Sequence, residues 1–323
     1  MSKFIINKTI KSYTRTLNIE GDKSLSIRWA LLASQAIGKS YAENLLKSDD
    51  VLNTLNCLKK LGTKIKKKKD KYEIHGLGLN GYEFKNNIVL NAGNSGTLSR
   101  LIMGLLIHSK KRIKLIGDKS LSKRDFLRVT KPLENFGANF KTKSGKLPIT
   151  VMGAKNPVPI RYYETKGSAQ CKSAIMLAAL NTKGETVIKA KKSRDHTELL
   201  FKYLKLPIKV YKKKEFDLIK INGGKIIKPI NYKIPTDISA CAFFIVLTAL
   251  SKNSQIKIKN VNINPTRSGV IKILNMMGVK VNFKNVKIYK GEKIADIHVK
   301  SVKSIKQIKC PSKLNSSAID EYL

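Results

Sequence analysis

The sequence has few cysteines and few acidic residues for its length of 323 residues. Its four cysteines, Cys57, Cys171, Cys241 and Cys310, are widely spaced, which excludes a disulfide-stapled secreted domain. The start of the chain lacks the continuous apolar segment of a signal peptide. The longest apolar run, 240–250, is too short to span a bilayer and predicts a core helix. We therefore expect a cytoplasmic protein with no membrane partner.

The charge is strongly one-sided, since 64 Lys and Arg face 22 Asp and Glu, a formal net charge of +42. Such a field attracts anions and suggests nucleic-acid binding as one class of function. The lysines are dispersed, however, and are not gathered with aromatic residues, so we expect no nucleic-acid partner. Only nine basic residues are arginine. Where lysine is the default cation, an arginine indicates a need for a planar, bidentate donor.

Motifs for metals and nucleotide cofactors are missing or stand in the wrong context. The four histidines have no metal-ligand spacing. A Gly-x-Gly-x-x-Gly sequence at 76–81 follows a predicted strand but precedes no helical pattern, so it predicts a turn and not a dinucleotide site. We expect neither a metal nor an organic cofactor.

A repeat of about 72 residues organises the chain. Helical patterns end at Gly62, Gly137 and Gly278, and each glycine is followed by alternating, strand-like residues. A further unit between the last two is predicted as a helix at 195–204 and a hairpin at 208–221, without the glycine. The fold class is therefore predicted as α/β, built from repeated β–α–β–α–β–β units.

One octapeptide occurs twice, as Gly-Asp-Lys-Ser-Leu-Ser-Ile-Arg at 21–28 and Gly-Asp-Lys-Ser-Leu-Ser-Lys-Arg at 117–124. The first copy is predicted to open an amphipathic helix and the second to precede a helix. Asp and Ser are good helix caps, but a Lys and an Arg at a helix start oppose the helix dipole. A bound anion would resolve this conflict, because free N–H groups and cations would both contact it.

Three further predicted helices begin with small, polar residues and continue with strongly apolar ones, at 93–100, 167–173 and 235–240. Each alone is explained by capping. Together they predict several helix N-termini around a substrate with several negative charges.

Six motifs in one order carry a family resemblance. They are Gly-Asp-Lys-Ser-x-Ser-x-Arg at 21–28, Gly-Asn-Ser-Gly-Thr at 93–97, Ser-Ala-Gln-x-Lys-Ser at 168–173, Ser-Arg-Asp-His-Thr-Glu at 193–198, Asp-Ile-Ser at 237–239 and Asn-Pro-Thr-Arg-Ser-Gly at 264–269. In this order the chain resembles the EPSP synthases (3-phosphoshikimate 1-carboxyvinyltransferases). Three segments are most similar to their class II branch: Gly-Ser-Ala-Gln at 167–170, Ser-Arg-Asp-His-Thr-Glu at 193–198 and Ile-Asp-Glu-Tyr at 319–322.

The resemblance implies an enzyme that transfers the enolpyruvyl group of phosphoenolpyruvate to the 5-hydroxyl of shikimate 3-phosphate and releases phosphate, in aromatic amino-acid biosynthesis. It implies an inverse α/β barrel of two domains, each made of βαβαββ units. One domain would be residues 21–231, and the second, incomplete domain would combine 1–20 with 232–323. A monomer is expected.

The resemblance also assigns residues at matching motif positions. The expected substrate-binding residues are Lys23, Ser24, Arg28, Asn94, Gly96, Arg124, Ser168, Ala169, Gln170, Arg194 and Asp320. Of these, Lys23 and Asp320 are also the expected catalytic residues, with Lys23 between the two substrates and Asp320 accepting the proton of the 5-hydroxyl.

The remaining roles divide by the anionic group contacted. Ser24 and Arg28 match residues that hold the shikimate carboxylate. Ser168, Ala169 and Gln170 match the group around the shikimate phosphate and ring, and Arg194 is a further phosphate ligand. Gly96 and Arg124 match contacts to phosphoenolpyruvate, and Asn94 lies in the same motif as Gly96. Because Gly96 has no side chain, the site should have room for glyphosate.

The sequence departs from the family pattern at its end, where Leu323 stands in place of proline and a Lys-Glu-Ser-Asp-Arg segment would follow. We therefore expect a truncated enzyme with little or no turnover. Three alternatives stay open: a UDP-N-acetylglucosamine enolpyruvyl transferase, a basic nucleic-acid-binding protein and an inactive remnant. Against the first, that family has Asn where Ser24 follows Lys23.

Overall fold

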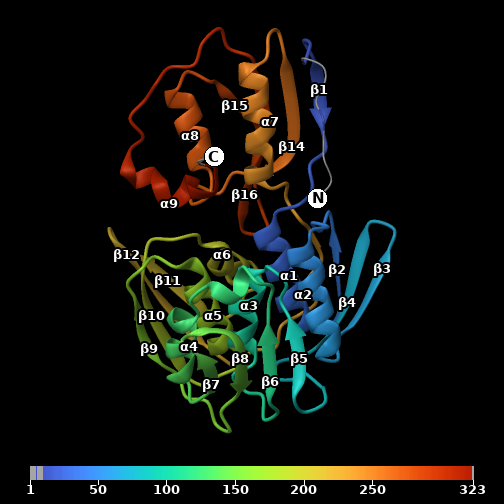
Figure 1. Cartoon of the computed structure of the whole chain (residues 1–323), viewed down its shortest axis with the longest axis vertical. Coiled ribbons are helices and arrows are strands. Elements are labelled where there is room, and N and C mark those ends of the chain that lie inside the picture. Colours follow the sequence, from blue (N-terminus) through green and yellow to red (C-terminus); the bar gives the residue numbers. More distant parts are fainter. Residues whose placement is uncertain (1–4, 6–9, 322–323) are drawn as a thin grey trace. The chain divides into compact units, whose positions relative to one another are not determined.

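The computed structural model describes residue 5 and residues 10–321. Two compact units divide the chain: Gly21–Ile234, and Met1–Glu20 with Pro235–Leu323 (Figure 1). We call the first the large unit and the second the small unit. Tyr322 and Leu323, which the sequence interpretation used, lie outside the described residues.

The large unit contains three copies of one arrangement of two helices and four strands. The first copy has α1 (Lys23–Ser34), β2 (Ile37–Glu43), α2 (Asp49–Lys60), β3 (Lys64–Lys68), β4 (Lys71–Leu77) and, from the far end of the unit, β13 (Tyr232–Lys233). The second has β5 (Ile88–Asn91), α3 (Gly96–Leu105), β6 (Ile113–Ile116), α4 (Leu127–Glu134), β7 (Asn139–Lys143) and β8 (Lys146–Met152). The third has β9 (Arg161–Glu164), α5 (Ala169–Leu180), β10 (Glu185–Lys191), α6 (His196–Tyr203), β11 (Ile208–Lys212) and β12 (Phe216–Asn222).

The sheets of these copies share one strand order, β13–β2–β4–β3, β5–β6–β8–β7 and β9–β10–β12–β11. In each sheet the first two strands run parallel and the remaining pairs are antiparallel. A parallel pair needs a crossover, which α3 and α5 supply in the second and third copies. In the first copy α1 precedes β2, and β13 joins β2 from the far end of the unit. The last two strands of each copy form an antiparallel hairpin. The predicted βαβαββ repeat is therefore confirmed.

The glycines that mark the repeat are required by their backbone conformation. Gly62, Gly137 and Gly278 have φ of 93°, 98° and 93°, all in the left-handed region that glycine tolerates best. In the third repeat the chain makes the same turn at Lys205, whose φ is 53°. The repeat without a capping glycine thus keeps the geometry and places a lysine in a strained conformation.

The core of the large unit is formed by the first helix of each repeat. Residues 25–34 of α1 and 171–180 of α5 are all buried, and α3 is nearly as enclosed. A Cβ on Gly104 of α3 would lie 2.2 Å from the backbone oxygen of Ala174 in α5, so glycine allows these two helices their close approach. The prediction that α1 is amphipathic is wrong, because neighbouring helices and its own sheet cover it on all sides.

The small unit repeats the same topology a fourth time. Its elements are β1 (Thr14–Leu17), α7 (Ile238–Leu250), β14 (Gln255–Asn262), α8 (Gly269–Met276), β15 (Val281–Tyr289) and β16 (Glu292–Lys300), with strand order β1–β14–β16–β15. Three short helices follow: η2 (Ser312–Leu314), α9 (Asn315–Ala318) and η3 (Ile319–Glu321). A Cβ on Gly269 would lie 2.4 Å from Ser317 Oγ, so this glycine lets α9 pack against the start of α8.

Helix α7 is buried on one face only. Ile238, Cys241 and Ile245 are fully buried, but Phe243 and Leu250 are 70% and 67% exposed. The prediction of a core helix is correct for the first face and wrong for the second. The reason is that α1, α3 and α5 cover one another in the large unit, whereas the described part of the small unit has one helix of this type. No helix among the described residues is long and apolar enough to cross a membrane.

Candidate functional site

The start of α1 combines a cap, a cation and a hydroxyl. Asp22 is the N-cap, and its Oδ1 accepts a hydrogen bond from the Leu25 amide at 2.9 Å. Lys23, the first helical residue, is exposed, with its Nζ 3.8 Å from Asp50 Oδ2, and Ser24 is half-buried. Because the first amides of a helix have no partner within it, this end is suited to an anion.

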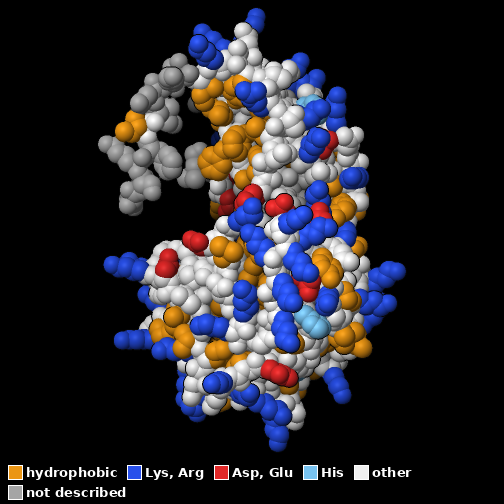
Figure 2. All heavy atoms as spheres, turned by 90° about the vertical axis from the view of Figure 1, so that its right-hand side faces the viewer, with side chains coloured by type: hydrophobic (Ala, Val, Ile, Leu, Met, Phe, Trp, Pro, Cys, Tyr) orange, Lys and Arg blue, Asp and Glu red, His pale blue; other side chains and the backbone are white. Residues whose placement is uncertain are grey.

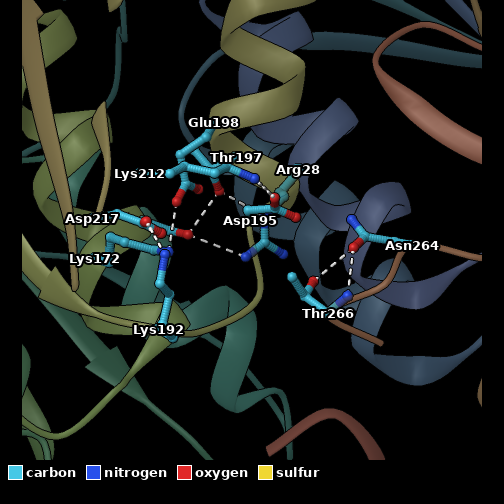
Figure 3. Close-up of polar contacts among 11 residues, drawn as sticks. Arg28, Lys172, Lys192, Asp195, Thr197, Glu198, Lys212, Asp217, Asn264 and Thr266 are labelled. Carbon is cyan, nitrogen blue, oxygen red and sulfur yellow. Dashed lines mark hydrogen bonds and ion pairs between the residues drawn. The ribbon is translucent and has the colours of Figure 1, made fainter. Parts of the chain in front are cut away.

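Arg28 lies one turn further along α1 and is buried. Its Nε donates to Thr197 Oγ1 at 2.8 Å and its Nη2 donates to Ser173 Oγ at 3.1 Å (Figure 3). The two hydroxyls are themselves hydrogen-bonded at 2.7 Å, and Arg28 Nη1 donates to the Ser24 carbonyl at 3.1 Å. One guanidinium thus joins α1 to α5 and α6 in a fixed orientation.

The start of α3 is capped by Ser95, whose side chain accepts from the Leu98 amide at 3.2 Å. The preceding residue, Asn94, bridges to the second copy of the octapeptide. Its Nδ2 donates to Asp118 Oδ2 at 2.6 Å, and its Oδ1 accepts from Arg124 Nη2 at 3.2 Å. Hydrogen bonds therefore join the motif at 93–97 to the second octapeptide copy.

Arg100 on α3 is a buried cation beside this bridge. Its Nη1 donates to Gln170 Oε1 at 2.6 Å, and Gln170 in turn donates to Thr97 Oγ1 at 3.1 Å. Burial, together with the positive charges of Arg128 and Arg124, lowers the pKa of Arg100 to about 10. A bound anion would favour the charged form of this cluster.

Gly96 at the start of α3 leaves room for these cations. A Cβ at this position would lie 2.9 Å from Arg100 Nη1 and 3.2 Å from Arg124 Nη1. Both guanidinium groups can approach the helix N-terminus because residue 96 has no side chain. Arg100 was not predicted as a site residue. The available signal was that arginine is rare in this chain and that Arg100 follows a predicted helix start.

The starts of α5 and α6 complete the group in the large unit. Ser168 is the N-cap of α5 and accepts from the Cys171 amide at 3.2 Å, and Ala169 and Gln170 are the first helical residues. Arg194 is half-buried, one residue before Asp195, the N-cap of α6. All predicted site residues except Asp320 thus lie in the large unit, at helix starts or in the octapeptide copies, and side-chain bonds link α1, α3, α5 and α6.

Asp320 lies in η3 of the small unit and is exposed. Its neighbour Glu321 accepts a hydrogen bond from Ser239 Oγ. Arg267 Nη2 donates to the same hydroxyl at 2.5 Å and to Asp237 Oδ1 at 3.3 Å. The motifs at 237–239 and 264–269 therefore meet at the start of α7, beside the helix that carries Asp320.

The structure also bears on the cofactor motifs. Within the described part of the chain, there is no group of three or more His, Cys, Asp or Glu side chains that could hold a metal ion. The glycine-rich segment at 76–81 ends β4 and turns at Gly78, whose φ is 80°, and no helix follows directly. The prediction of a turn is confirmed, and all four cysteines are free.

Comparison with known proteins gives a consistent result. The family model described as EPSP synthase (3-phosphoshikimate 1-carboxyvinyltransferase) matches residues 8–314. A 3-phosphoshikimate 1-carboxyvinyltransferase of Vesicomyosocius okutanii is 42% identical over 323 residues, which are 100% of this chain and 73% of the relative. The enzyme of that name from Zymomonas mobilis is 37% identical over 98% of this chain and 70% of its own length.

Solved structures are similar as well. A structure of EPSP synthase from Acinetobacter baumannii matches with a TM-score of 0.86 and 36% identity, covering 97% of this chain and 70% of that chain. The predicted α/β fold class is confirmed by this match.

Proposed function

The chain belongs to the EPSP synthase family, and on this premise we propose that it transfers the enolpyruvyl group of phosphoenolpyruvate to the 5-hydroxyl of shikimate 3-phosphate. The oxygen of that hydroxyl forms a bond to the carbon of phosphoenolpyruvate that carries the phosphate, and its proton passes to a base. The bond between that carbon and the phosphate oxygen breaks, which releases inorganic phosphate. The reaction belongs to the shikimate pathway of aromatic amino-acid biosynthesis.

The carboxylate of shikimate 3-phosphate is assigned to Arg28 and Ser24. Ser173 and Thr197 hold two edges of the Arg28 guanidinium, and the Ser24 carbonyl holds a third position. A guanidinium whose rotation is prevented in this way offers a carboxylate donors at fixed positions. The Ser24 amide and hydroxyl lie at the helix N-terminus, where the dipole favours negative charge.

The phosphate and ring of shikimate 3-phosphate are assigned to the start of α5. Ser168, Ala169 and Gln170 provide backbone amides and a side-chain amide there, and Arg194 precedes α6. Gln170 is oriented by its bonds to Arg100 and Thr97. Support for this assignment comes from the first amides of α5, which have no partner within the helix, and from the cation that precedes α6.

Phosphoenolpyruvate is assigned to Gly96, Asn94 and Arg124, with Arg100 adding positive charge behind them. Phosphate and carboxylate groups of this substrate are suited to two guanidinium groups at a helix N-terminus. Lys23 is assigned the position between the two substrates as a point charge. Asp320 is assigned as the base that takes the proton of the 5-hydroxyl, a role that an ionised carboxylate can perform at hydrogen-bond distance.

The observation that carries the proposal is the group of cations near linked helix starts. Burial and the neighbouring charges of Arg128 and Arg124 lower the pKa of Arg100 there, and a bound anion would compensate this concentration of positive charge. The test is calorimetric titration of the chain with shikimate 3-phosphate, followed by phosphoenolpyruvate. We expect shikimate 3-phosphate to bind to the wild-type chain, and we expect the substitution R28M to weaken this binding. Absence of binding at concentrations that saturate the Zymomonas mobilis relative would overturn the proposal. Phosphate release that requires both substrates measures the reaction.

The proposal extends to partners and location. We propose a cytoplasmic monomer with no nucleic-acid or membrane partner. Figure 2 shows Lys and Arg spread over the visible face and not gathered in one patch, which supports the first of these absences. Light scattering measures the molar mass, and filter binding of DNA at physiological salt would detect a nucleic-acid partner.

A further inference from the structure

A buried ion pair joins α5 to α6 beneath Arg28. Lys172 Nζ lies 2.5 Å from Glu198 Oε1, and the side chains are 0% and 4% exposed. Figure 3 shows this pair close to Arg28 and Thr197. Neither residue has been assigned a contact to substrate above.

Each member of the pair is next in sequence to a hydroxyl that holds Arg28. Lys172 precedes Ser173 on α5, and Glu198 follows Thr197 on α6. The two hydroxyls are bonded to each other at 2.7 Å and accept from Arg28 at 3.1 and 2.8 Å. A sliding or rotation of α6 against α5 would therefore separate the acceptors of one guanidinium.

Stability alone is a weak reason for such a pair. Removing two charges from water costs about as much as their attraction returns, and apolar side chains of similar volume are often equally stable or better. The pair does differ from apolar packing in one respect: it tolerates few arrangements of the two helices, because any other would leave a buried charge unpaired.

We propose that Lys172 and Glu198 are positioning residues that fix α5 against α6, so that Ser173 and Thr197 hold the Arg28 guanidinium in the orientation that binds the substrate carboxylate. This rests on the proposed function, in which Arg28 contacts the carboxylate of shikimate 3-phosphate. The pair acts through these hydroxyls and does not itself contact the substrate.

The test compares two ligands in the full chain by calorimetry. They are shikimate 3-phosphate and its analogue with a hydroxymethyl group in place of the carboxylate. The ratio of their dissociation constants measures discrimination for the carboxylate. In K172M/E198L we expect this ratio to fall by about tenfold or more, the size expected for a misplaced charged hydrogen bond. The melting temperature should stay equal or rise.

Matched controls separate positioning from general packing. K220M breaks the surface pair Lys220–Glu185, whose atoms are 3.3 Å apart, and should leave the ratio unchanged. The ¹⁵N-detected Nε–H signal of Arg28, identified by its loss in R28K, should shift in K172M/E198L and not in K220M. A purely structural role of the pair would change the melting temperature and leave both readouts as in the wild type.

The outcomes are distinguishable. If R28M keeps the wild-type ratio, the proposed role of Arg28 is wrong and the positioning role falls with it. If R28M loses the discrimination but K172M/E198L keeps it, only the positioning inference is overturned. Should K172M/E198L fail to fold, K172Q/E198Q replaces it, because its amides keep one weaker bond at similar volume. A partial loss of the ratio is then expected, and an unchanged ratio overturns the inference.

Discussion

Replacing Gly96 by alanine should weaken anion binding while leaving the fold intact. The new Cβ would lie 2.9 Å from Arg100 Nη1 and 3.2 Å from Arg124 Nη1, whereas atoms at optimal contact are about 3.5 Å apart. Both guanidinium groups must therefore move by a few tenths of an ångström. The backbone accepts the change, because residue 96 is not among the glycines with positive φ.

The magnitude follows from the bond that the movement disturbs. Arg100 Nη1 lies 2.6 Å from Gln170 Oε1, and a charged hydrogen bond contributes about 1.5–3 kcal/mol. Losing part of it, about 1 kcal/mol, corresponds to roughly a fivefold loss of affinity for an anion held by this cluster. Alanine is a better helix former than glycine by up to about 1 kcal/mol, so the free energy of unfolding should change little.

The assay is calorimetric titration of phosphoenolpyruvate, and separately of glyphosate, into protein saturated with shikimate 3-phosphate. Urea unfolding gives the stability. The control is G104A on the same helix, where the Cβ would lie 2.2 Å from the backbone oxygen of Ala174 and stability should fall by several kcal/mol. Equal affinity of G96A and wild type for phosphoenolpyruvate would refute the reasoning, as would a stability loss in G96A as large as in G104A.

Three further predictions concern stability. Lys205 has a left-handed backbone with φ of 53°, which glycine adopts without strain. In K205G the free energy of unfolding, measured in urea, should therefore rise by about 1 kcal/mol. A lower free energy of unfolding would contradict the assigned strain. The Asp118 carboxylate accepts hydrogen bonds from the Leu121 amide and from Asn94, and these bonds lower its pKa below the usual range of an aspartate. The stabilisation from these bonds is present above the unfolded pKa of about 4 and is lost as the pH falls through the folded pKa. The free energy of unfolding of D118N should therefore fall less than that of the wild type between pH 5 and pH 2, and parallel curves would argue against this account. The variant F243S removes a side chain that is 70% exposed. Its free energy of unfolding should stay within about 0.5 kcal/mol of the wild-type value, and binding of the dye ANS should decrease. A fall of more than about 1 kcal/mol in the free energy of unfolding would show that Phe243 is packed.

The sequence predicted the repeats because their signals are local. A glycine with a left-handed backbone ends a helix and starts a hairpin, and Gly62 and Gly137 mark both events within a few residues. Lys205 makes the same turn without a sequence signal, because packing of the third repeat imposes it. The strands β1 and β13 were not predicted as the first strands of their sheets, since their partners are distant in sequence.

The site was predicted unevenly for a similar reason. Helix caps such as Asp22 and Ser168 were readable from adjacent residues. The partners of Arg28 were not, because Ser173 and Thr197 meet only when α5 packs on α6. The exposed face of α7 was also unpredictable, since an apolar run shows that a helix can be buried and says nothing about what covers each side.

The strand β13 has a consequence for synthesis of the chain. Ile230 accepts from Trp29 and donates to Ser40, a separation of 190 residues or more, and Tyr232 pairs with Ala42. Closing a loop of that length in an unfolded chain costs about 4–5 kcal/mol, and prior folding of the intervening repeats shortens the loop. Of the three repeats in the large unit, the first to leave the ribosome is therefore the last to be completed. Until then the edge of β2 stays unpaired, open to chaperones and to neighbouring nascent chains.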